Sequence, residues 1–205
     1  MKYTQLLATT FILLIATTCL AQKPYPTMGR VVYDDPRLEK LLPKGSAIEV
    51  LASGFIWTEG PVWVKDSACL LFSDAPQNTI FSWSEKDGIK PFLKPAGYIG
   101  RGKYSREPGS NGLIIDQQGR LVACEHGDRR ISAMPLTGGG KITLADKFEG
   151  KRFNSPNDIV QHPTNLSYYF TDPPYGLPGY DKDPTREIDF FGVYRIAPDG
   201  KVSLV

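Results

Sequence analysis

The feature that most constrains this fold is a pattern of short strand-like segments that occurs three times along the chain. The three copies begin at Glu59, Asn111 and Asn157, which lie 52 and 46 residues apart. In each copy an apolar first segment leads through a polar turn to a second segment, and a glycine-containing turn separates a third segment from a fourth. The second segments all end in an acidic residue: Asp74, Glu125 and Asp172.

These segments are rich in β-branched and aromatic residues, which favours strands, and the repeats lack the spacing of an amphipathic helix. Four short antiparallel strands at a period of about 50 residues are typical of β-propeller blades. We therefore predict an all-β domain over residues 47–205, with about three blades of a β-propeller. The alternative is a β-sandwich with accidental similarity, and the agreement of four strands, three turns and a terminal acid disfavours it.

Three blades cannot close a ring and would leave unpaired edges, so the propeller is predicted to be incomplete at the C-terminus. Residues 47–54 are predicted to form an extra strand that lacks its proper blade partner. Residues 177–191 are an insertion in the third copy, for which a lid and a plain loop both remain open.

The N-terminus has the pattern of a signal peptide. Lys2 precedes an apolar stretch at residues 6–14, and small residues lead to a cleavage point before Gln22. We predict a signal peptide at residues 1–21 and a secreted or periplasmic protein, with a lipid anchor at Cys19 as the weaker alternative. Residues 22–46 form a proline-rich leader with one short helix at residues 36–42, capped by Asp35.

Composition excludes several classes of protein. The chain has 205 residues, of which 41% are apolar, so it is not disordered. The formal charge of +2 is too small to indicate a nucleic-acid partner. Three cysteines are too few for a disulfide scaffold, and Cys69 and Cys124 are predicted either to pair or to be buried free thiols. We expect no membrane span, and a monomer at full length.

The first strand of each propeller blade lines the central channel, so its leading residue is expected to point at the axis. Here these residues are Glu59, Asn111 and Asn157. A carboxylate and amide oxygens are ligands that a hard cation such as Ca²⁺ prefers. No pair of imidazoles or thiolates favours zinc, and His126 is expected to hydrogen-bond within a loop. The three recurring acids are expected to have a structural role at the strand ends.

Several ordered motifs together resemble the SMP-30/gluconolactonase/LRE-like family, over about residues 48–205. The motifs are Glu59-Gly60-Pro61 with Trp57 and Trp63, Ser110-Asn111-Gly112, Cys124-Glu125-His126-Gly127, Asn154-Ser155-Pro156-Asn157-Asp158 and Phe170-Thr171-Asp172-Pro173-Pro174-Tyr175-Gly176. The resemblance implies a six-bladed propeller with one divalent cation in the channel and a hydrolase that opens lactones, including sugar lactones. Ca²⁺ is the expected cation, with Mg²⁺, Mn²⁺ and Zn²⁺ as alternatives.

The resemblance assigns roles residue by residue. The family's first-blade metal glutamate matches Glu59, and its third-blade asparagine matches Asn157. Its remaining ligands, an asparagine and the aspartate that is the usual general base, would lie beyond Val205, so the catalytic residue is unknown. Animal sugar lactonases have an arginine where this chain has Ser155, which leaves the identity of the lactone open.

Four residues are predicted to contact the substrate: Asn111, Asp158, Asp172 and Tyr175. Asp158 and Asp172 are also the substitutes for the missing base among the residues present, and Tyr175 is expected at the pocket rim. The alternatives to a lactonase are a phosphotriesterase or esterase of the same family, and a non-enzymatic propeller that binds a ligand or protein. The 205 residues alone are expected to be inactive.

Overall fold

The computed structural model describes residues 25–205, so the predicted signal peptide and Cys19 lie outside the described residues. The chain divides into two compact units, Met1–Ser53 and Gly54–Val205. In the part of the chain that the structure describes, no helix combines the length and apolarity that crossing a membrane requires.

The described part of the first unit contains one short helix. The 3-10 helix η1 (Pro36–Lys40) is shorter than the predicted helix at residues 36–42, and Asp35 caps it by accepting a 2.8 Å hydrogen bond from the Arg37 backbone N–H. The predicted strand at residues 47–54 is wrong. Only an isolated bridge joins Thr27 to Glu49, and a strand needs a continuous ladder to satisfy its backbone groups.

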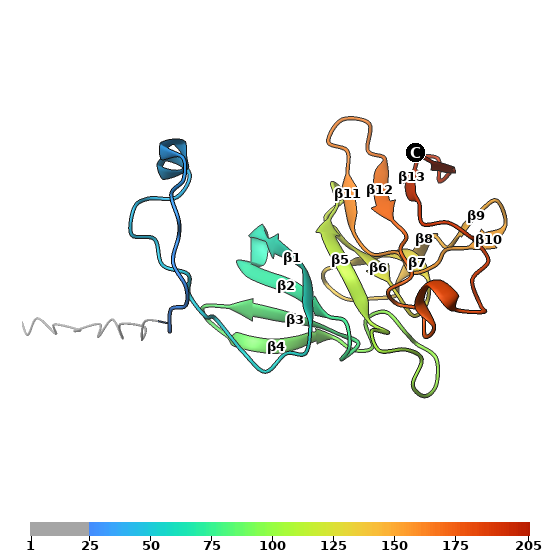
Figure 1. Cartoon of the computed structure of the whole chain (residues 1–205), viewed down its shortest axis with the longest axis horizontal. Helices are drawn as coiled ribbons and strands as arrows, with labels where there is room; N and C mark the ends of the chain where they lie inside the picture. Colours follow the sequence, from blue (N-terminus) through green and yellow to red (C-terminus); the bar gives the residue numbers. More distant parts are fainter. Residues whose placement is uncertain (1–24) are drawn as a thin grey trace, which may run out of the picture. The chain divides into compact units, whose positions relative to one another are not determined.

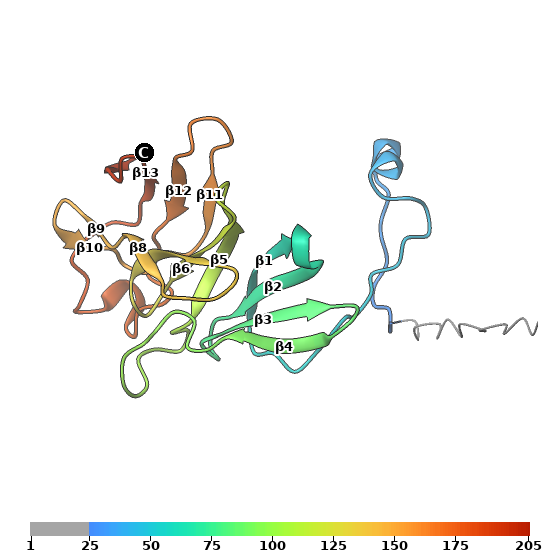
Figure 2. The same cartoon turned by 180° about the vertical axis from the view of Figure 1, so that it is seen from behind.

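The second unit contains three four-stranded antiparallel sheets, each with its strands in chain order (Figures 1 and 2). The first blade consists of β1 (Thr58–Val64), β2 (Cys69–Asp74), β3 (Thr79–Ser84) and β4 (Gly88–Leu93). The second consists of β5 (Ser110–Ile115), β6 (Arg120–Glu125), β7 (Arg130–Pro135) and β8 (Ile142–Ala145). The third consists of β11 (Ile159–Gln161), β12 (Tyr168–Thr171), β13 (Val193–Ile196) and β14 (Val202–Leu204). The prediction of three propeller blades is confirmed.

Two further elements lie between the predicted strands. A small hairpin of β9 (Lys147–Phe148) and β10 (Lys151–Arg152) was not predicted. Its turn residues, Glu149 and Gly150, both have positive φ, which is typical of the tightest hairpin turns. The insertion at residues 177–191 contains only the 3-10 helix η3 (Tyr180–Lys182).

Alternating side chains of the second blade fill the spaces on both of its faces. Leu121 and Ala123 pack in a cluster with Leu71 and Ile80 of the first blade. The intervening residues, Val122 and Cys124, pack instead in a cluster with Phe170 and Tyr194 of the third blade. This two-residue period is the geometry of a strand whose faces are both buried.

The structure also settles the state of the two cysteines. Cys124 is a fully buried free thiol, and its burial raises its pKa. Cys69 is also free but only half-buried. Of the two alternatives that the sequence left open, the structure has free thiols and no disulfide between these cysteines, and only Cys124 is buried.

Glycines allow the innermost strands to approach one another closely. Strand β1 contacts β5, and β5 contacts β11. Gly60 has a φ of +54°, and a Cβ added there would lie 2.3 Å from the Asn111 carbonyl oxygen. At the next interface the Gly112 backbone N–H donates a 2.7 Å hydrogen bond to the Asn157 carbonyl. The backbones of Glu59, Asn111 and Asn157 are therefore held against one another.

The variant Gly60→Ala should destabilise the full-length protein by about 1–3 kcal/mol or more, because its Cβ would overlap the backbone of the next blade and L residues disfavour positive φ. Urea unfolding measures this change as a lower midpoint. Gly140→Ala is the matched control, since a Cβ there meets nothing within 4 Å. Equal midpoints for the two variants would contradict the close approach.

Candidate functional site

The three channel residues predicted from the sequence line one pocket of about 290 Å³. Glu59 comes from β1, Asn111 from β5, and Asn157 from the segment that leads into β11. Four further residues complete the lining: Trp57, Glu107, Tyr175 and Tyr180. The structure therefore brings together Glu59, Asn111, Asn157 and Tyr175.

A tryptophan orients the Glu59 carboxylate. The Trp57 Nε1–H donates a 2.7 Å hydrogen bond to Glu59 Oε1. No residue between 25 and 205 donates a hydrogen bond to the other carboxylate oxygen, Oε2, or hydrogen-bonds the side-chain amide of Asn111. Acceptor oxygens therefore remain available in the pocket.

Sequence reasoning missed a second carboxylate in this pocket, that of Glu107. Its pKa is raised by burial, with Arg106 acting in the opposite direction and the negative charge of Glu59 adding to the rise. Two acidic side chains therefore lie within electrostatic range of each other. Glu107 belongs to the segment between the first two blades, outside the repeated strands, so the repeat pattern gave no signal for it.

His126 connects this segment to Asn157. The imidazole is fully buried, its Nδ1 lies 3.1 Å from the Glu107 carbonyl oxygen, and its Nε2 lies 3.5 Å from Asn157 Nδ2. Burial lowers the pKa of His126 to about 4, so the ring is neutral at physiological pH. The expected hydrogen bond of His126 within a loop is observed.

The acids at the ends of β2 and β12 fix the segments that lead to the channel. Asp74 Oδ2 accepts a 2.9 Å hydrogen bond from the Ile56 backbone N–H. Asp172 Oδ2 accepts a 2.7 Å bond from the Asn154 N–H, also 18 residues earlier. Each acid thus holds backbone three residues before a pocket residue. Asp172, predicted as a substrate contact, does not line the pocket, and its strand-end position has the expected structural role.

Asp158, the other aspartate predicted to contact substrate, also does not line the pocket. Its Oδ1 accepts a 2.9 Å hydrogen bond from the Ile159 backbone N–H at the start of β11. It lines a separate hollow of about 180 Å³ on the third blade, with Val160 and Val193 among its neighbours. Its side chain therefore hydrogen-bonds the backbone at the start of β11 and does not line the pocket.

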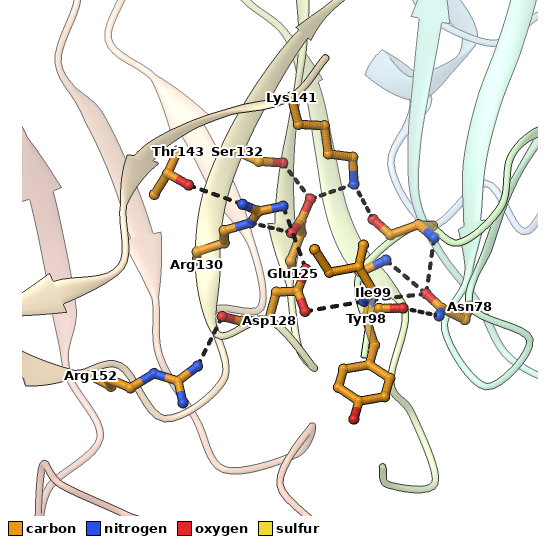
Figure 3. A network of polar contacts seen from close by, with 12 residues as sticks. Asn78, Tyr98, Ile99, Glu125, Asp128, Arg130, Ser132, Lys141, Thr143 and Arg152 are labelled. Carbon is orange, nitrogen blue, oxygen red and sulfur yellow. Dashed lines mark hydrogen bonds and ion pairs between the residues drawn. The ribbon is translucent and has the colours of Figure 1, made fainter. Parts of the chain in front are cut away.

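The third recurring acid, Glu125 at the end of β6, binds side chains instead of backbone (Figure 3). Its fully buried carboxylate accepts hydrogen bonds from Arg130 Nε at 2.6 Å and Ser132 Oγ at 2.5 Å, and it pairs with Lys141 Nζ. Lys141 also donates to the Ala96 carbonyl. The buried charge is thus fully paired, and it ties the second blade to the segment after the first.

Two more side chains in Figure 3 hold the start of this connecting segment. The Asn78 Oδ1 accepts hydrogen bonds from the backbone N–H groups of Ala96, Gly97 and Tyr98. Asp128 Oδ1 accepts a 3.2 Å bond from the Ile99 N–H. The segment that carries Glu107 into the pocket is therefore fastened by polar contacts from both blades.

The Asp172 carboxyl carries an electrostatic cost of burial near the site. Burial raises its pKa from 3.8 to about 7, against the effect of the Asn154 backbone hydrogen bond. Its Oδ1 is buried without a hydrogen-bond partner among the described residues. The native state therefore binds a proton here that the unfolded chain releases between about pH 4 and pH 7.

The variant Asp172→Asn should remove a pH-dependent loss of stability. Because the folded pKa is raised, the contribution of Asp172 is fully present near pH 4 and is lost as the pH rises towards 7, by at most roughly 1.4 kcal/mol per pH unit. Urea unfolding between pH 4 and 8 should show that the free energy of unfolding of the variant rises relative to that of the wild type as the pH increases. Asp66→Asn controls for removal of an exposed carboxylate, and a constant wild-type-to-variant difference would contradict the raised pKa.

The donor atoms of the pocket fit a hard cation, although they do not form a complete site. No group of three or more His, Cys, Asp or Glu residues within 25–205 could hold a metal ion. The pocket instead combines the Glu59 carboxylate with the amides of Asn111 and Asn157. Carboxylate and amide oxygens suit Ca²⁺, Mg²⁺ or Mn²⁺ better than zinc.

The fold and this pocket define a class of protein, a β-propeller with oxygen-bearing side chains at the channel ends of successive blades. A family model of the SMP-30/gluconolactonase/LRE-like region matches residues 57–205. The chain belongs to the SMP-30/gluconolactonase/LRE-like family, as its motifs predicted.

The gluconolactonase of Zymomonas mobilis subsp. mobilis is 41% identical over 182 residues, which are 87% of this chain and 51% of that protein. An X-ray structure of a protein assigned as a gluconolactonase is 37% identical with a TM-score of 0.72, covering 83% of this chain and 56% of that one. For the gluconolactonase structure from Xanthomonas campestris the identity is 30%, the TM-score 0.63 and the coverages 77% and 49%. The chain therefore spans about half the length of these relatives.

Proposed function

We propose that the full-length protein carrying this chain hydrolyses sugar lactones, with its active site at the pocket of Glu59, Asn111 and Asn157. The observation that carries the proposal is the convergence of these three side chains, each from a different blade, on one pocket. Gluconolactonases at 41% and 30% identity support the choice of a lactone as substrate.

We propose further that Glu59 and Asn157 hold one divalent cation, with Ca²⁺ as the expected ion and Mg²⁺, Mn²⁺ or Zn²⁺ as alternatives. A bound divalent cation supplies positive charge that stabilises the negative charge developing on a lactone carbonyl oxygen. The neighbouring Glu59 and Glu107 carboxylates give the pocket a negative potential that favours such an ion.

The other pocket residues orient the substrate in this proposal. Trp57 fixes Glu59 through its indole hydrogen bond. The Asn111 amide and the phenols of Tyr175 and Tyr180 offer donors and acceptors that suit sugar hydroxyls. The general base stays assigned by family resemblance to an aspartate beyond Val205.

The full-length protein should open glucono-1,5-lactone, and a chelator should remove that activity. Without the cation, the negative charge that develops on the lactone carbonyl oxygen would no longer be stabilised. A pH-stat follows the acid released before EDTA, after EDTA and after addition of Ca²⁺. Undiminished turnover in EDTA would contradict the cation, and hydrolysis of phosphotriesters alone, or of no substrate, would contradict the lactonase.

A matched pair of variants ties the activity to the pocket. Glu59→Gln keeps the shape of the side chain but removes its charge, so both hydrolysis and Ca²⁺ binding should weaken by at least about tenfold. Glu85→Gln removes an exposed carboxylate outside the pocket and should leave both unchanged.

We also propose that the protein acts after export, because residues 1–21 have the pattern of a signal peptide. When the complete sequence is expressed in a Gram-negative host, mass spectrometry of the purified protein should give a mature N-terminus at Gln22. A chain that begins at Met1, or at a lipid-modified Cys19, would contradict ordinary cleavage.

A further inference from the structure

We propose that His126 is a positioning residue that orients the side-chain amide of Asn157, so that its Oδ1 is presented to the cation. This inference rests on the proposed function, in which Asn157 is a ligand. It gives a role to a buried imidazole that contacts the side chain of one pocket residue, Asn157, and the backbone carbonyl of another, Glu107.

The contact with Glu107 determines which nitrogen of the imidazole carries the proton. The Glu107 carbonyl oxygen, 3.1 Å from Nδ1, can only accept a hydrogen bond, so Nδ1 carries the proton. The ring is fully buried, and its hydrogen-bond partners among residues 25–205 include no carboxylate, so the ring is neutral and has a single N–H. Nε2 is therefore an acceptor.

The Nε2 atom in turn determines the orientation of the Asn157 side-chain amide. Nε2 lies 3.5 Å from Asn157 Nδ2, and an acceptor at this point favours the NH₂ group over the carbonyl oxygen. Rotating the amide by 180° would place Oδ1 against the Nε2 lone pair. The backbone of Asn157 is already held, since its N–H donates to the Thr171 carbonyl at 2.9 Å and its carbonyl accepts from Gly112 at 2.7 Å. His126 thus decides which end of the amide faces away from the ring.

The imidazole itself is held in place by its backbone and by a neighbouring segment of the chain. The His126 backbone N–H donates a 3.1 Å hydrogen bond to the Gly109 carbonyl. On the other side, a Cβ added to Gly176 would lie 2.3 Å from the Cβ of His126, so the chain passes directly over the ring. The ring is therefore a rigid support that reaches Asn157 from beneath the pocket lining.

The 3.5 Å contact between Asn157 Nδ2 and His126 Nε2 lies at the outer limit of a hydrogen bond. When Oδ1 ligates a cation, electron density moves towards that oxygen and the NH₂ group becomes a stronger donor to Nε2. Hydrogen-bonded partners behind metal ligands typically contribute about 10- to 100-fold to affinity. The contact with His126 is of this kind.

Two substitutions separate the two hydrogen bonds of His126. In His126→Gln the Oε1 atom can take the place of Nε2 and accept from Asn157, while the bond to Glu107 is lost. In His126→Asn the Nδ2 group can take the place of Nδ1 and donate to Glu107, while the acceptor for Asn157 is lost. Calorimetric titration of the full-length variants with Ca²⁺, alongside thermal unfolding without the ion, reads both effects.

We expect His126→Asn to weaken Ca²⁺ binding by about 10- to 100-fold, and His126→Gln to remain within about threefold of the wild type. If the imidazole had only a structural role, the Ca²⁺ affinities of the two variants would follow their thermal stabilities, or neither variant would change the affinity. Either result would overturn the proposal. A second measurement needs no variant. The ¹⁵N shifts of His126 in the wild type should show a protonated Nδ1 and a bare Nε2, and the other tautomer would overturn the proposal.

The Glu59→Gln variant distinguishes this inference from the proposed function. If the wild type binds no Ca²⁺, or if Glu59→Gln leaves binding unchanged, the proposed function fails and the His126 proposal fails with it. If Glu59→Gln weakens binding while His126→Asn does not, only the role of His126 is wrong.

Discussion

The close backbone contact between neighbouring inner strands is the constraint on which the rest of this structure depends. At Gly60 the next blade lies where a side chain would be, and at Gly112 the backbone hydrogen-bonds directly to the blade after. These contacts bring the first residues of successive blades to one place. A carboxylate and two amides, from positions 98 residues apart at the extremes, thereby share a pocket of about 290 Å³.

Buried polar groups then turn this closeness into defined geometry. Asp74 and Asp172 hold the backbone just before Glu59 and Asn157, whereas Glu125 holds the segment that carries Glu107. Such groups are costly to bury unless they are paired. Asp172 bears such a cost, since burial raises its pKa to about 7. The same end of the blades thus contains the pocket and the groups that brace it.

Much of this could be predicted from the sequence, because repetition and strand periodicity are local signals. The strands of all three blades and the channel positions of Glu59, Asn111 and Asn157 followed from the repeat alone. Glu107 and the orientation of His126 did not, since they depend on a connecting segment folding back over the blades. Asp158 and Asp172 were predicted at the pocket from their neighbours in sequence, but strand alternation and backbone bonding direct their side chains elsewhere. The prediction of a strand at residues 47–54 was wrong. The apolar pattern of this segment is compatible with a strand, but among the described residues it pairs only through the bridge between Thr27 and Glu49.

The central claim is that side-chain oxygens from separate blades converge to hold one cation in the channel. A crystal structure of the full-length protein grown with Ca²⁺ tests it most directly. The ion is predicted between the Glu59 carboxylate and Asn157 Oδ1, with both oxygens at about 2.3–2.6 Å from it. A channel that stays free of the ion at saturating Ca²⁺, or an ion bound by other groups while Glu59 and Asn157 point away, would contradict the claim.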